Sequence, residues 1–166
     1  SKTQNNLEAT LNRALELGIN HLETAHGYGT SEYQFGKLLP SLDRDSYILQ
    51  SKIQPHAEVE QFQADFEDSM SCLKVEHLDL MGIHGINNQE RLDWTLRKGG
   101  CLDRAKQWKK EGRIKHIGFS THATPDIILK AIESDEFEYV NLHWYYFMQK
   151  NHPAVEAARQ RDMGVF

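Results

Sequence analysis

Apolar residues recur at intervals of three and four along much of the chain, which is the spacing that places them on one face of a helix. Val59, Phe62, Phe66, Met70 and Leu73 show this pattern most clearly and predict an amphipathic helix. Predicted helices run from about Asn5 to Leu17, from Ser31 to a stop at Pro40, from about Glu58 to Leu73, from Leu102 to Gly112, from Pro125 through Ile132 and from Pro153 to Arg161.

Short apolar segments that are typical of buried strands stand between these predicted helices. Ile19 and Leu22 suit a first buried strand, and Val165 and Phe166 look like the beginning of a last one. The segment Gly85–Gly100 is polar and has no period, so we expect a working loop there. The remaining predicted strands are Tyr47–Lys52, Leu78–His84, Ile114–Ser120 and Tyr139–Leu142.

Capping residues mark several of the predicted helix ends. Gly18 and Gly164 stand where a C′ glycine would close the first and the last helix. Ser31 and Gln34 have the spacing of a capping box. Thr124 precedes a proline, which is typical of an N-cap followed by proline at the first helical position.

Strands and helices alternate strictly, which predicts a parallel sheet with right-handed crossovers. Both an open doubly wound sheet and a closed eight-stranded barrel fit this order. The open sheet would need a glycine-rich phosphate turn, and no G-x-G-x-x-G occurs. The barrel is favoured because polar side chains end the strands, and in a barrel those ends meet at one rim. The side chains in question are Glu23, Lys52, His84, Ser120 and Asn141.

A complete TIM barrel, (β/α)8, takes about 250 residues, whereas this chain has 166. Its pattern offers five strands and the stub of a sixth. We therefore predict a single α/β domain over residues 1–166, an incomplete barrel that lacks its first strand and its last two. Unpaired strand edges would make such a fragment unstable or lead it to pair with another copy. The sequence specifies no oligomeric state.

Composition and charge narrow the function classes. The 19 basic and 24 acidic side chains give 19 − 24 = −5, with no basic cluster, which argues against a nucleic-acid partner. No apolar run approaches the roughly 20 residues needed to cross a membrane, and the polar start, Ser1–Asn6, does not resemble a signal peptide. We expect Cys72 and Cys101 to be free thiols of a cytoplasmic protein.

Candidate chemistry lies on the turn that follows the first strand. Gly27 and Gly29 flank Tyr28, so a phenol and the acid Glu23 are held on one loop. The aromatic run Trp144–Phe147 is interpreted as half core and half wall of a substrate pocket. Four histidines could share the same rim, but without an H-x-H or H-x-x-x-H spacing we predict no metal ligands. They are His26, His84, His122 and His143.

Four ordered motifs resemble those of the aldo-keto reductase family. The segment Gly18–Glu32 is similar to the signature G-I-N-x-x-D-T-A-x-x-Y-G-x-S-E, and Ser51-Lys52, Leu78–His84 and Gly112–Ser120 are similar to its later motifs. Together they extend over nearly the whole chain. The Gly-Phe-Ser-Thr-His segment most resembles a branch that often carries a C-terminal iron–sulfur domain. A cluster of that kind would require a C-terminal region that these residues do not include.

The resemblance implies a catalytic tetrad of Glu23, Tyr28, Lys52 and His84. A carbonyl that receives hydride needs a nearby proton donor. A phenol, whose ordinary pKa is about 10, donates well at neutral pH only if a cation lowers that value. Lys52 is expected to be that cation, Glu23 its anchor and His84 the group that orients the carbonyl. Glu23 stands where the family has aspartate, and its carboxylate is displaced by about 1.5 Å, one C–C bond.

The resemblance also implies a nicotinamide cofactor, NADP or NAD. Its amide would lie against Ser120 and against Asn141, where the family usually has glutamine. Thr121 occupies a position that is commonly asparagine. We therefore expect an oxidoreductase that transfers hydride between this cofactor and a small carbonyl or alcohol, with Tyr28 as proton donor. The alternatives are a dinucleotide-binding or sensor barrel with little turnover and a metal-dependent hydrolase on the same barrel.

Overall fold

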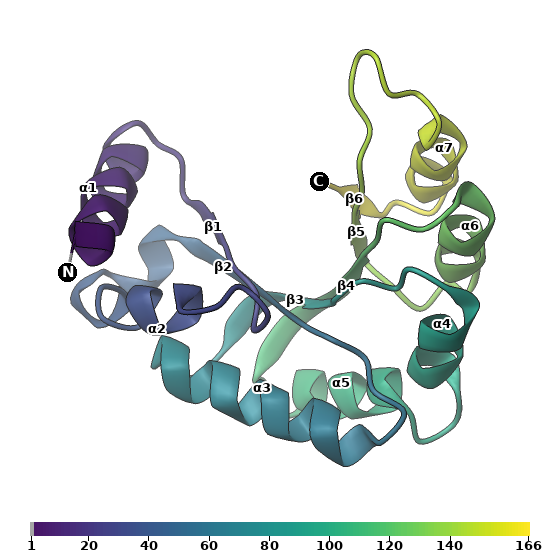
Figure 1. Ribbon diagram of the computed structural model, residues 1–166, viewed down its shortest axis with the longest axis horizontal. Coiled ribbons are helices and arrows are strands. Elements are labelled where there is room, and N and C mark those ends of the chain that lie inside the picture. The colour runs from purple at the N-terminus through teal and green to yellow at the C-terminus, as the bar shows by residue number, and fades with distance from the viewer. Residues whose placement is uncertain (1) are drawn as a thin grey trace.

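The computed structural model describes residues 2–166 and contains a six-stranded parallel sheet whose strands follow one another in chain order. Each pair of neighbours is parallel. The sheet curls into a half-barrel with the helices on its convex side, as Figure 1 shows. A doubly wound sheet would carry helices on both faces, so the predicted barrel type is confirmed. The strands are β1 (His21–Glu23), β2 (Ile48–Ile53), β3 (Leu78–Ile83), β4 (Ile114–Ser120), β5 (Tyr139–Asn141) and β6 (Gly164–Val165).

Among the described residues α1 precedes β1, and six further α-helices and two short 3-10 helices lie between the strands. The core lies between the sheet and these helices. Its centre is Trp108, which stacks on Phe66 at a ring-centroid distance of 3.8 Å and contacts Phe62, and all three side chains are fully buried. The helices are α1 (Lys2–Glu16), α2 (Ser31–Phe35), η1 (Leu39–Ser41), η2 (Arg44–Ser46), α3 (Val59–Leu73), α4 (Gln89–Leu96), α5 (Cys101–Lys110), α6 (Pro125–Glu133) and α7 (His152–Gln160).

Of the two predicted C′ glycines, Gly18 closes its helix and Gly164 does not. Gly18 has φ +80° and is the C′ residue of α1, as predicted. The amide of Ile19 bonds to the carbonyl of Ala14, which makes this helix end a Schellman motif. The prediction for Gly164 is wrong. The left-handed residue after α7 is Asp162, with φ 56°, and Gly164 belongs to β6.

The predicted capping box is also wrong. Ser31 is the first residue of α2, and Thr30 is its N-cap. The side-chain amide of Gln34 donates to the Thr30 hydroxyl at 2.7 Å. The helix ends at Phe35 instead of continuing to the proline. A Cβ on the next residue, Gly36, would lie 1.8 Å from the Cys72 carbonyl oxygen, so the turn after α2 is packed against the end of α3.

Three further expectations need correction. The polar segment Gly85–Gly100 contains α4, whose N-cap Asn88 accepts a hydrogen bond from the Arg91 amide. Few side chains of α4 are buried, which is why it lacks an apolar period.

Ile19 is exposed and precedes the strand. The aromatic run Trp144–Phe147 is exposed throughout and contributes nothing to the core. The predicted N-cap at Thr124 is confirmed.

Both cysteines are free thiols, as predicted. No helix among residues 2–166 has the length and apolar character needed to cross a membrane.

Candidate active site

The carboxyl ends of the strands surround one cavity of about 270 Å³. Tyr28, from the loop after β1, lies at the same cavity. Every residue that the sequence singled out for catalysis or cofactor binding lines it: Glu23, Tyr28, Lys52, His84, Ser120, Thr121 and Asn141.

Lys52 is the most buried charged group of this cavity. It is 1 % exposed, and its Nζ donates a hydrogen bond to Glu23 Oε1 at 2.5 Å. A buried ammonium needs such a counter-charge, because the cost of removing it from water is otherwise uncompensated. The other Glu23 oxygen accepts from Asn141 Nδ2 at 3.2 Å. The glutamate therefore reaches Lys52 and at the same time connects it to β5.

Tyr28 is held at the edge of the cavity by a tight turn. Its amide bonds to the Ala25 carbonyl, and Gly29 follows with φ +59°. The ring is half exposed. Lys52 Nζ lies 4.9 Å from its centroid, and the His84 ring meets it edge-on at 5.6 Å. An ammonium and an imidazole thus lie beside the phenol.

His84 is neutral in this site. Burial, together with the positive charges of Lys52 and Arg91, lowers the pKa of His84 to about 4. Its Nδ1 has no hydrogen-bond partner among the described residues. A neutral imidazole at the mouth of the cavity can orient a substrate oxygen without competing for a proton at neutral pH.

The two hydroxyl residues predicted to bind the cofactor, Ser120 and Thr121, differ in whether the hydroxyl proton is free to donate a hydrogen bond. The Ser120 hydroxyl accepts from the Gly85 amide at 3.0 Å, which leaves its own proton available to an amide carbonyl. Thr121 is 2 % exposed, and its hydroxyl donates to the Ile86 carbonyl and accepts from the Ala123 amide. Ser120 therefore has a free hydrogen-bond donor, whereas the Thr121 hydroxyl is used within the loop.

Asn141 belongs to a polar chain that the sequence reading missed. Gln50 Nε2 donates to Asn141 Oδ1 at 2.8 Å, and Gln50 Oε1 contacts His21 Nε2 at 2.9 Å. Gln50 is two residues before Lys52 and His21 two before Glu23. Because alternate residues of a strand face the same side, this spacing was the available signal.

Two histidines complete the rim. His122 and His143 lie with ring centroids 4.6 Å apart and line the same cavity. Among residues 2–166 there is no group of three His, Cys, Asp or Glu side chains placed to hold a metal ion.

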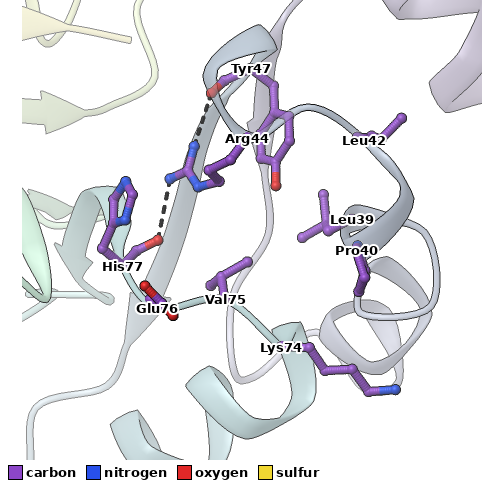
Figure 2. A pocket seen from close by; sticks show the side chains of 9 residues that line it. All are labelled: Leu39, Pro40, Leu42, Arg44, Tyr47, Lys74, Val75, Glu76 and His77. Atoms are coloured by element: carbon purple, nitrogen blue, oxygen red, sulfur yellow. Dashed lines mark hydrogen bonds between the residues drawn. The ribbon is translucent and has the colours of Figure 1, made fainter.

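A second cavity, of about 290 Å³, lies at the amino ends of β2 and β3 (Figure 2). Arg44 donates to the carbonyls of Tyr47 and His77, as Figure 2 shows. It also donates to Asp79 Oδ2, so its guanidinium connects the beginnings of the two strands. We assign this arrangement a structural role, because the reactive strand ends lie at the opposite rim.

The curled parallel sheet with its polar carboxyl rim defines the class as part of a (β/α) barrel. A family model described as "Aldo/keto reductase family" matches residues 1–166, and the chain belongs to that family.

Individual proteins are similar to this chain in sequence or in fold. L-galactose dehydrogenase of Arabidopsis thaliana is 29% identical in an alignment of 121 residues that covers 68% of this chain and 37% of that protein. A Pseudomonas aeruginosa protein described as an aldo-keto reductase, PA4992, superposes with a TM-score of 0.84 at 23% identity, over 98% of this chain and 65% of the other. An aldo-keto reductase complexed with NADPH gives 0.75 at 18% identity, over 93% and 50%. The chain thus spans less than two thirds of the length of each of these relatives.

Proposed function

We propose that the full-length protein is a nicotinamide-dependent oxidoreductase that interconverts a small carbonyl compound and its alcohol. The observation that carries the proposal is the contact of Lys52 with both Glu23 and the Tyr28 ring, with His84 beside them. Family membership and the NADPH complex of a structural relative support it.

In this proposal the dinucleotide supplies or accepts the hydride. The Tyr28 hydroxyl gives its proton to the carbonyl oxygen as that oxygen gains charge. The Lys52 ammonium stabilises the phenolate that remains, and Glu23 holds the ammonium in place. His84 orients the carbonyl oxygen, and the Ser120 hydroxyl donates to the nicotinamide amide. NADP and NAD both satisfy these contacts.

The test is the oxidation of reduced nicotinamide by the full-length protein with a simple aldehyde. We expect Tyr28→Phe to lower turnover by roughly 100-fold or more, because the proton donor is lost. Tyr33→Phe is the matched control: Tyr33 is 54% exposed against 50% for Tyr28, and Lys37 Nζ lies 4.4 Å from its centroid. Equal turnover in wild type and Tyr28→Phe contradicts the proposal.

One observation favours a second candidate, a barrel that binds the dinucleotide without useful turnover. Thr121, at a position where an amide contact is expected, has its hydroxyl committed to the loop. Tight cofactor binding without carbonyl reduction, unrepaired by Glu23→Asp, would support this candidate. No arrangement of residues in 2–166 favours the metal-dependent hydrolase.

A further inference from the structure

Lys52 and Tyr139 occupy the two ends of one row across the sheet. Lys52 pairs laterally with Gly82, Gly82 with Gly118, and Gly118 with Tyr139. The row therefore begins with an ammonium on β2 and ends with a phenol on β5, and two residues without side chains separate them.

The Tyr139 side chain fills the space above those glycines. A Cβ on Gly118 would lie 2.5 Å from three carbons of the Tyr139 ring. A Cβ on Gly82 would lie 3.3 Å from the Tyr139 hydroxyl oxygen and 3.0 Å from Lys52 Cγ. The phenol thus reaches across β4, and its hydroxyl shares the space over Gly82 with the Lys52 stem.

That hydroxyl is buried and has no hydrogen-bond partner among the described residues. Tyr139 is 2 % exposed. Burial, and to a lesser degree the charge of Glu23, raises the pKa of Tyr139 well above its ordinary value, so the phenol stays neutral. An unpaired buried hydroxyl lowers stability, and its retention calls for an explanation.

Lys52 has the complementary need. An ammonium carries three donors, and the hydrogen bond to Glu23 uses one of them. The side chain is almost fully buried, so bulk water does not supply the remaining acceptors. A water held by the neutral phenol oxygen next to the stem can supply one.

We propose that one buried water bridges the Lys52 ammonium and the Tyr139 hydroxyl, which makes Tyr139 a positioning residue for the reaction. The hydrogen-bonded contact stands by itself, whereas the positioning role rests on the proposed function. Tyr139 supports the ammonium from inside the barrel, while Glu23 holds it from β1 and Tyr28 stands at its outer side.

A double-mutant cycle tests the contact without any activity. Tyr139→Phe removes the hydroxyl alone, so we expect the folding equilibrium constant of the full-length protein at pH 7 to fall about tenfold. In a Lys52→Met background the same change should have no such effect or should stabilise. Tyr47→Phe is the control, because Tyr47 is a buried phenol at the opposite rim. It should change the folding equilibrium constant by the same factor in the wild-type and Lys52→Met backgrounds. An equal effect of Tyr139→Phe in both backgrounds overturns the proposal.

The second measurement is the pH profile of alcohol oxidation. Without the hydroxyl, the ammonium stabilises the Tyr28 phenolate less well. We expect the pH of half-maximal turnover to move about one unit to the alkaline side in Tyr139→Phe, in kcat and with little change in KM. An unmoved profile overturns the positioning role even if the cycle shows coupling. Absence of redox activity in the wild type contradicts the proposed function instead, and the cycle still decides whether the contact exists.

Discussion

Glu23 and Lys52, 29 positions apart in the sequence, form an ion pair with 2.5 Å between Oε1 and Nζ. The lysine is buried and the glutamate is partly exposed, so the pair joins the inside of the half-barrel to its open rim. Because the second carboxylate oxygen contacts Asn141, the glutamate connects three strands.

This geometry predicts the effect of changing Glu23. Asp lacks the length to reach both Lys52 and Asn141, so Glu23→Asp should not raise turnover in the full-length protein. Glu23→Gln removes the counter-charge of a buried ammonium and should cost about 3 kcal/mol or more of unfolding free energy. Urea unfolding and steady-state turnover check both variants. A Glu23→Asp variant faster than the wild type would show that the longer side chain is a defect.

His84 predicts a stability change with pH. Its folded pKa of about 4 lies below the ordinary value of 6.5, so the unfolded chain binds the extra proton between these values. The stabilisation that the neutral His84 side chain gives the folded protein is fully present above pH 6.5 and is lost as the pH falls toward 4. It amounts to at most on the order of 3 kcal/mol of unfolding free energy, because solvent at the partly exposed ring screens part of the electrostatic effect.

The unfolding free energies of wild type and His84→Gln between pH 4.5 and 7 measure that contribution. The wild type should lose stability relative to His84→Gln as the pH falls from about 6.5, and the difference between the two should be constant above that pH. Parallel curves would show that His84 is equally easy to protonate in both states.

Glu32 predicts opposite outcomes for two substitutions. It is 4 % exposed and accepts from the hydroxyls of Ser51 and Ser69. Burial raises the pKa of Glu32 despite these bonds, so its charged form opposes folding at neutral pH. Glu32→Gln should leave stability at pH 7 unchanged or raise it. Glu32→Ala, which leaves both hydroxyls without their acceptor, should cost about 2 kcal/mol. Thermal unfolding of both variants is the measurement.

Gly36 predicts a large packing cost. A Cβ there would lie 1.8 Å from the Cys72 carbonyl, which is backbone and cannot move aside. We expect Gly36→Ala to lose about 3 kcal/mol or more, at the upper end for overpacking. In Gly27→Ala the nearest atom is 3.7 Å away, so this control should lose much less. Similar losses in both would contradict the packing explanation, because the unfolded-state effect of Gly→Ala is stabilising.

The sequence alone predicted the alternation of strands and helices, the barrel type and the polar residue at each strand end. These features have local signals, because apolar periodicity, caps and strand ends are written in neighbouring residues. The same logic failed where packing decides. The helix α4 buries too little to show a period, and Asp162, in place of a glycine, ends α7.

What only the tertiary structure decided is which further residues meet, beyond the tetrad that the resemblance implied. No local pattern indicates that Glu23 reaches both Lys52 and Asn141, or that Gly82 and Gly118 clear a path for Tyr139 toward Lys52. Those contacts depend on the register between strands. Register is set by the packing of the whole sheet, so contacts that the family resemblance did not imply appear only in the structure.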